Sequence, residues 1–289
     1  MSKIAKLTLL CLLFVYGTAA VAQIDTPQPS PAGSVYSKVG LTDVTVDYFR
    51  PGVKGRKIFG EGDSYLQPYG VLWRTGANSG TKVTFSTEVT VAGTKVPAGE
   101  YLIFSTPGKT EWTVSLYKDL SIGGNVNGYD AANEVVKTTV KAIKLTEPVE
   151  RLTFNISDIS EDNSKAAIQM SWADASFKLP IEVSFVEDVM KAIEKQTKVN
   201  PVVYVQAANF YFSQNTELDK ALEYMNMYLA VGENSKQFWN VHTKAKIQAA
   251  LGKKKEAIAT AKESMETAKA SGNDFGYVKR NQDLNDSLK

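Results

Sequence analysis

The hydrophobic periodicity of this chain changes once, near Glu187, and that change limits the possible folds more than any single motif does. Before it, apolar and polar residues alternate, as in the run Val44-Thr45-Val46-Asp47-Tyr48. After it, apolar residues recur at helical spacing, as Val203, Ala207 and Phe210 do. A period of about 2 indicates strands and a period of about 3.6 indicates helices. The sequence therefore predicts a mainly β region followed by an α region.

About nine short strands are predicted before Glu187, separated by turn residues and without intervening helices. They cover residues 44–49, 82–86, 88–91, 100–105, 111–117, 134–143, 151–157, 166–172 and 177–185. A parallel sheet needs crossover connections, usually helices, between its strands, whereas turns are enough to join antiparallel ones. We therefore expect an antiparallel β-sandwich or jelly-roll-like domain over residues 33–185.

The region 187–289 contains two similar blocks at an offset of 36 residues: Lys220-Ala221-Leu222 corresponds to Glu256-Ala257-Ile258, and Val205 to Val241. These blocks resemble the tetratricopeptide repeat, a helical hairpin whose period is about 34 residues. The period differs slightly and the closing proline of that repeat is missing. We expect a helical, repeat-like region that packs on the sandwich, because two repeats are too few to be stable alone.

The N-terminal residues 1–22 have the three parts of a secretory signal peptide. Lys3 and Lys6 precede an apolar run, residues 7–16, and Ala20-Val21-Ala22 forms a small-x-small cleavage site. We expect cleavage after about Ala22, a Pro- and Ser-rich linker over residues 23–32, and an exported protein, periplasmic or secreted. Cys11, the single cysteine, lies inside this signal, so the mature chain has no thiol or disulfide.

Charge and composition exclude several classes of function. The chain has 33 Lys and Arg against 31 Asp and Glu, and two of the cations, Lys3 and Lys6, leave with the signal. A balance this even argues against a general binder of nucleic acid. No later run is apolar and long enough for a transmembrane segment. His242 is the single histidine, so no histidine triad or histidine zinc site is expected and His242 is interpreted as a packing or surface residue. We predict no metal and no cofactor.

The segment 50–80 is the most unusual stretch, because it is neither a good strand nor a good helix and is rich in basic and aromatic residues. An irregular segment of about 30 residues inside a compact domain is usually functional or disordered, and dense aromatic residues argue against disorder. Guanidinium groups bind carboxylates and phosphates, and aromatic rings stack on sugars or planar groups. The candidate ligand-binding residues are Arg50, Lys54, Arg56, Tyr69, Trp73, Arg74 and Asn78.

Two other interpretations of this segment stay open. In the first, Arg50, Arg56 and Arg74 form ion pairs inside the protein and hold the loop on the sheet as a structural scaffold; the acidic partners would be Asp47, Glu61, Asp63 or Glu100. In the second, Asp47 or Glu61 acts with Glu100 in a carboxylate-based hydrolase of envelope polysaccharide or peptide. Nothing in the spacing selects a pair of carboxylates, so the catalytic residues are unknown. The leading hypothesis is a binding protein of the cell envelope whose ligand is anionic or a carbohydrate, with the helices as a surface for a protein partner.

Four motifs in order resemble a known family. They are RPGVKGRKIFG at residues 50–60, PYGVLWRTGAN at 68–78, VPAGEY at 96–101 and EWTV at 111–114. Together they are similar to the DUF2911 family, a domain of unknown function found in exported bacterial proteins, and the resemblance covers about residues 34–183. It implies a β-rich extracytoplasmic domain, often followed by a helical tail, and it supplies no catalytic residues.

Overall fold

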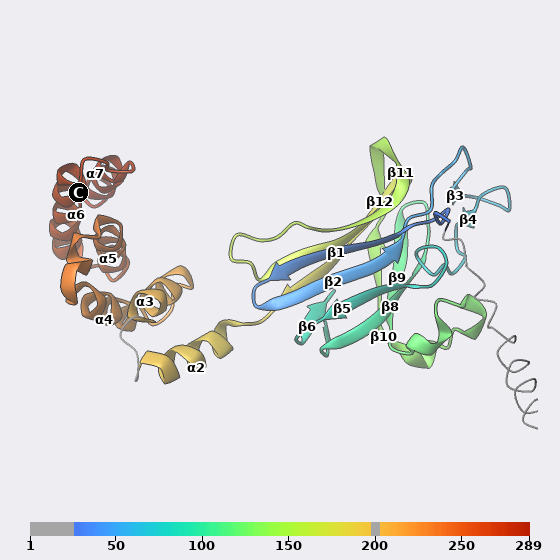
Figure 1. Cartoon of the computed structure of the whole chain (residues 1–289), viewed down its shortest axis with the longest axis horizontal. Helices are drawn as coiled ribbons and strands as arrows, with labels where there is room; N and C mark the ends of the chain where they lie inside the picture. Colours follow the sequence, from blue (N-terminus) through green and yellow to red (C-terminus); the bar gives the residue numbers. More distant parts are fainter. Residues whose placement is uncertain (1–25, 198–202) are drawn as a thin grey trace, which may run out of the picture.

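The computed structural model describes residues 26–197 and 203–289. Figure 1 shows antiparallel sheets followed by helices, which confirms the predicted combination of a mainly β part and an α part. The predicted signal peptide, its cleavage site after Ala22 and the first residues of the predicted linker lie outside the described residues. The first strand begins at Ala32, the last residue assigned to the linker.

The β part contains two antiparallel sheets. One has the spatial order β1 (Ala32–Val39), β2 (Thr42–Phe49), β5 (Thr81–Phe85), β8 (Gly99–Thr106), β9 (Glu111–Tyr117), β10 (Glu134–Lys141). The other has the order β11 (Ile143–Ser157), β12 (Lys165–Val183), β6 (Val89–Val91), β7 (Thr94–Val96). A short parallel pair, β3 (Phe59–Gly60) with β4 (Gln67–Pro68), lies inside the segment 50–80. Three 3-10 turns, η1 (Leu120–Ile122), η2 (Val126–Gly128) and η3 (Ala131–Asn133), lie between β9 and β10.

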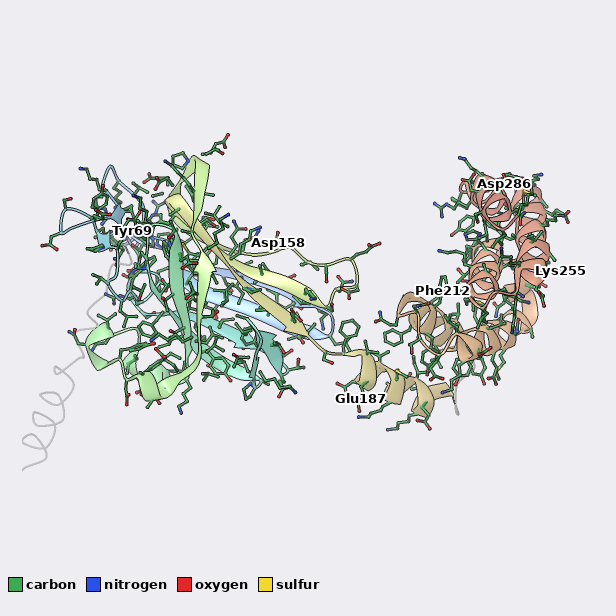
Figure 2. The ribbon with its side chains drawn as sticks, turned by 180° about the vertical axis from the view of Figure 1, so that it is seen from behind. Tyr69, Asp158, Glu187, Phe212, Lys255 and Asp286 are labelled. Carbon is green, nitrogen blue, oxygen red and sulfur yellow. The ribbon has the colours of Figure 1, made fainter. Side chains whose placement is uncertain are left out.

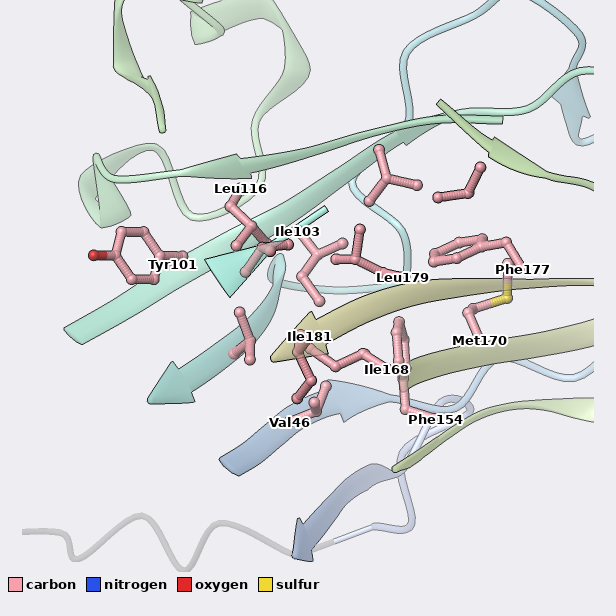
Figure 3. Packing of buried hydrophobic residues seen from close by; sticks show 14 of the residues in the cluster. Val46, Tyr101, Ile103, Leu116, Phe154, Ile168, Met170, Phe177, Leu179 and Ile181 are labelled. Atoms are coloured by element: carbon pink, nitrogen blue, oxygen red, sulfur yellow. The ribbon is translucent and has the colours of Figure 1, made fainter. Parts of the chain in front are cut away.

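The two sheets share one apolar core, which defines a sandwich. Ile103 of the first sheet and Ile168 and Ile181 of the second belong to the same buried cluster, shown in Figure 3. Along β2 every second residue is buried, as the alternation of apolar residues predicts. Burial of one face of each sheet therefore follows directly from the sequence pattern.

The strands differ from the prediction at several places: β11 begins at Ile143 and not at residue 151, and the short strands β3, β4 and β7 were not predicted. The expected strands 166–172 and 177–185 form a single strand, β12, in which Ala173 takes a positive φ of 51° and the register with β11 shifts. The expected break between these two strands is thus a local irregularity within a continuous strand. The edge strand β1 was not predicted, because backbone hydrogen bonds to β2 hold it in place and its side chains have no clear apolar pattern.

The α part contains α2 (Val186–Thr197), α3 (Tyr204–Ser213), α4 (Leu218–Leu229), η5 (Gly232–Lys236), α5 (Phe238–Ala250), α6 (Lys254–Ala270) and α7 (Tyr277–Ser287). Consecutive helices from α3 to α7 pack on one another. Figure 1 shows these five helices lying apart from both sheets, with α2 between them and the sandwich. Leu41, in the turn between β1 and β2, lines a hollow together with residues of α2 and α3. Within those residues, no helix has the length and apolar character needed to cross a membrane.

Candidate ligand-binding site

Backbone hydrogen bonds attach the segment 50–80 to both sheets. The Val53 N–H donates to the Glu150 carbonyl (2.7 Å), and Leu152 N–H donates to the Pro51 carbonyl (3.0 Å), so the segment begins along β11. Farther on, Trp73 and Ser105 exchange both of their backbone hydrogen bonds (2.8 and 2.9 Å), which joins the segment to β8. The segment is therefore an ordered part of the sandwich. Figure 2 shows Tyr69 at the end of the sandwich opposite to Glu187.

A tight turn after Trp73 sets the direction of Trp73 and Arg74. The indole N–H of Trp73 donates to the Gly76 carbonyl (3.1 Å), and the hydroxyl of Thr81 donates to the carbonyl of Thr75 (2.7 Å). A Cβ atom on Gly76 would lie 2.8 Å from the Thr81 Oγ1 atom, closer than real Cβ atoms come. Glycine at position 76 is therefore required by this close approach.

A cluster of four aromatic rings lies beneath the turn. Trp73 stacks on Trp172 of β12 with a centroid distance of 5.8 Å and an interplanar angle of 23°. Phe59 contacts Trp73, Trp112 and Trp172 edge-on, at 5.7, 4.9 and 5.8 Å. Such arrangements are favourable for aromatic pairs. The cluster packs the irregular segment against β9 and β12.

Four of the seven predicted site residues, Arg56, Trp73, Arg74 and Asn78, line one pocket of about 350 Å³. We call it the arginine pocket. Its apolar walls are Pro51, Leu66, Leu72, Ala77, Val126 and Trp172. The pocket therefore combines two guanidinium groups with aromatic and aliphatic surface.

The two arginines of this pocket donate to backbone carbonyls. Arg56 donates to Val53 (3.1 Å) and Gly52 (2.5 Å), and Arg74 donates to Asn78 (2.8 Å). Each guanidinium carries more N–H groups than these bonds use. Both arginines therefore keep donors for a ligand.

Two of the four carboxylates that the scaffold interpretation assigned to the arginines, Asp47 and Glu100, have other partners. Asp47 accepts a hydrogen bond from the Ser34 hydroxyl (2.7 Å), and Glu100 pairs with Lys82 (2.6 Å). Among the described residues, no arginine forms a salt bridge. The arginines thus hold the loop through carbonyl groups, which leaves their positive charges without a neutralising carboxylate.

The other three predicted site residues lie elsewhere. Arg50 donates to the Leu152 carbonyl (3.4 Å) and the Thr153 hydroxyl (3.1 Å) of β11, so it serves to attach the segment. Lys54 is exposed at a positive φ of 49°, and its backbone N–H donates to Glu150 Oε1 (3.0 Å). Tyr69 lines a second pocket. The sequence motif therefore contains residues with different roles.

The second pocket has a volume of about 340 Å³ and is lined by other rings of the aromatic cluster. Phe59 and Trp112 form part of its wall, and Tyr69, Lys109 and Asp174 are among its polar residues. Burial raises the pKa of the Tyr69 phenol, and the negative charge of Asp174 raises it further. Tyr69 therefore remains a neutral hydrogen-bonding group at neutral pH.

A third hollow, of about 510 Å³, lies on the outer face of the six-stranded sheet, where Phe49, Leu102 and Leu120 line it. Its two charged residues, Asp47 and Lys82, are the ones already bonded to Ser34 and Glu100. This hollow therefore offers mainly apolar surface, in contrast with the arginine pocket.

Three wall residues of the arginine pocket lie outside the segment 50–80 and were not predicted: Ser30, Val126 and Trp172. They come from the chain before β1, the loop between β9 and β10, and β12. A tryptophan inside a predicted strand is normally interpreted as a core residue. No pattern in the local sequence links these three positions to segment 50–80. Only the approach of the chain segments in space places them together.

Comparison with known proteins identifies the family. The family model described as "Protein of unknown function (DUF2911)" matches residues 30–181. No curated protein and no solved structure matches the chain. The matched range covers more than half of the chain and contains every residue of the arginine pocket. The chain therefore belongs to the DUF2911 family.

Proposed function

We propose that this chain is an exported binding protein of the cell envelope and that its arginine pocket takes a small ligand with an anionic group. The observation that carries this proposal is the convergence of Arg56 and Arg74 with Trp73 and Asn78 on one pocket. Guanidinium groups bind carboxylate and phosphate through paired hydrogen bonds, and an indole ring supplies a flat apolar surface.

The charge of the pocket supports an anion. Its lining contains Arg56 and Arg74 and, within the described residues, no Asp or Glu. Arg74 is half-buried and lies beside the buried Trp73, and a positive charge that is partly shielded from water attracts a negative group more strongly than the same charge would in open solvent. A carboxylate-based hydrolase needs two carboxyl groups facing the substrate, and this pocket supplies neither. A structural role fits Arg50, whose hydrogen bonds go to β11.

The proposed location rests on the sequence of residues 1–22, which has the basic, apolar and small-residue parts of a signal peptide. We propose periplasmic or secreted localisation on that basis.

For the helices we propose a tetratricopeptide-like arrangement that presents a surface to a protein partner. Ala221 and Ala257, which correspond at the 36-residue offset, are both fully buried, and Val241 is buried while its counterpart Val205 packs on the helical core. Each helical hairpin, α3 with α4 and α5 with α6, therefore uses the same position of the repeat for packing.

Arg74→Ala tests the proposal, with Arg151→Ala as the matched control. Both arginines donate one hydrogen bond to a backbone carbonyl, Arg74 to Asn78 and Arg151 to Arg50, but only Arg74 lines the pocket. The probes are benzoate and inorganic phosphate, and binding is followed by tryptophan fluorescence because Trp73 and Trp172 form the wall. Losing a charge-assisted hydrogen bond costs about 1.5–3 kcal/mol, or roughly 10- to 100-fold in affinity.

We expect wild type and Arg151→Ala to bind at least one probe equally and Arg74→Ala to bind it at least about tenfold more weakly. Equal weakening in both variants would show a general charge effect and would contradict a local site. Failure of wild type to bind either anion at concentrations up to about 10 mM, where millimolar Kd values are detectable, would contradict it as well.

A further inference from the structure

One buried hydrogen-bond donor in the wall of the arginine pocket has no acceptor. The side chain of Trp172 is 1% exposed, and its Nε1 atom finds no hydrogen-bond partner among the described residues. Its stacking partner Trp73 is also buried, but the N–H of Trp73 donates to Gly76 (3.1 Å). Buried donors without an acceptor are rare in folded proteins and call for a specific explanation.

The position of Trp172 points to a ligand as that explanation. Trp172 lines the same pocket as Arg56 and Arg74. Exposure increases from the buried Trp172 through the half-buried Arg74 to the exposed Arg56. Trp172 thus places an unpartnered, solvent-shielded donor within the wall of the pocket, and the two charged side chains lie nearer the solvent. An oxygen atom that reaches the buried part would satisfy the indole N–H.

We infer that the ligand of the arginine pocket is a carboxylic acid with a planar or aliphatic body, and that one carboxylate oxygen accepts a hydrogen bond from Trp172 Nε1. This inference rests on the function proposed above. A carboxylate carries a single negative charge and has two oxygens, which suits one indole donor together with one guanidinium. The aliphatic walls, formed by Leu66, Leu72 and Val126, suit the apolar body. A phosphate dianion is costlier to desolvate and needs more donors than this buried part offers.

The first test is nuclear magnetic resonance of the full chain with ¹⁵N-labelled indoles. The four tryptophans, at positions 73, 112, 172 and 239, give four indole signals that Trp→Phe variants assign. Benzoate is compared with benzamide, which has the same ring without the charge, and with inorganic phosphate. We expect benzoate to move the Trp172 indole proton downfield, as formation of a hydrogen bond does, and the other two probes to leave it in place.

The second test compares Trp172→Phe with Trp112→Phe. Both side chains are 1% exposed and both rings contact Phe59, but Trp112 does not line the arginine pocket. We expect Trp172→Phe to weaken benzoate binding about tenfold, the effect of losing one hydrogen bond to a charged group, and Trp112→Phe to leave it unchanged. Because the lost N–H has no partner, Trp172→Phe should lower the melting temperature no more than Trp112→Phe does.

Other results would contradict the inference alone or the proposed function as well. If benzoate binding depends on Arg74 but not on Trp172, the hydrogen bond from Trp172 is wrong, and the anion site proposed for the arginine pocket is still supported. Binding of phosphate without benzoate leads to the same conclusion. Binding of neither anion removes both the inference and the proposed function. A larger loss of melting temperature for Trp172→Phe than for Trp112→Phe would show that the Trp172 indole stabilises the protein without a ligand, and would overturn the inference.

Discussion

At the scale of residues, the arginines of segment 50–80 have different roles. Arg50 attaches the segment to β11, whereas Arg56 and Arg74 line the pocket. The stem of Arg50 also crosses Gly33, where an added Cβ atom would lie 3.0 Å from the Arg50 Cδ atom. Arg50 is therefore expected to act on stability and the other two arginines on binding.

Arg50→Ala should lower the free energy of unfolding by about 1–2 kcal/mol, because it removes two hydrogen bonds from a half-buried site and leaves the Leu152 carbonyl with one donor fewer. Lys54→Ala is the control, since the Lys54 side chain is exposed and its change should stay within about 0.5 kcal/mol. Urea unfolding of the two variants measures both values. Equal effects would show that Arg50 does not anchor the segment.

Two adjacent glycines in the loop between β9 and β10 should differ in how much an added side chain destabilises the protein. Gly124 has φ 85°, and a Cβ atom there would lie 2.6 Å from the Gly80 nitrogen. Gly123 has φ 54° and nothing within 4 Å of its Cβ position. Gly123→Ala should cost about 1–2 kcal/mol, the cost of a left-handed conformation with a side chain. Gly124→Ala should lower the free energy of unfolding by more, because the backbone of Gly80 must also move. Urea unfolding measures both values, and equal losses would contradict this prediction.

At the scale of elements, α5 and α7 are joined by the single histidine. The Nδ1 atom of His242 lies 2.8 Å from Asn281 Oδ1, and the amide of Asn281 donates to Ser264 of α6 (2.9 Å). Burial lowers the pKa of His242 below its ordinary value of 6.5, and the positive charges of Lys246 and Arg280 lower it further. The hydrogen bond with Asn281 acts in the opposite direction.

The helical part should therefore lose stability as the pH falls below 6.5. The folded state holds His242 neutral, so the unfolded state binds the proton more readily at that pH, and protonation favours unfolding. Above pH 6.5 the contribution is fully present. Thermal unfolding followed by the helical circular dichroism signal at several pH values measures the effect. His242→Gln, which cannot titrate, should flatten this dependence, and an unchanged dependence would assign it to other groups.

At the scale of the whole molecule, the sandwich has a buried cluster and helices α3, α4 and α5 have another. The sheets share one core, and the helices enclose another that includes Ala208, Tyr211 and Met225. A region with its own core can fold without its neighbour.

Residues 23–186 should therefore fold alone as β-structure. Far-ultraviolet circular dichroism of that fragment is expected to show a β spectrum with a cooperative thermal transition. A spectrum with much helix, or with no regular structure, would contradict the boundary near Glu187.

Several features of the fold could be predicted from the sequence alone. The alternation in β2 and the helical spacing after Glu187 indicate the correct element type, because these periods follow from local backbone geometry. Features that depend on distant partners were missed. The edge strand β1 owes its conformation to β2, and Ala173 interrupts the pattern of β12 without ending the strand.

The sequence by itself determined the order of β and α parts, the family and the segment that contains the candidate site, since each is encoded in contiguous residues. The tertiary structure alone decided which arginines share a pocket and which one anchors the loop. Backbone bonds to β8 and β11 orient the segment, and Ser30, Val126 and Trp172 complete the walls from distant parts of the chain. Side-chain direction and enclosure arise from packing between segments far apart in sequence, which no local pattern records.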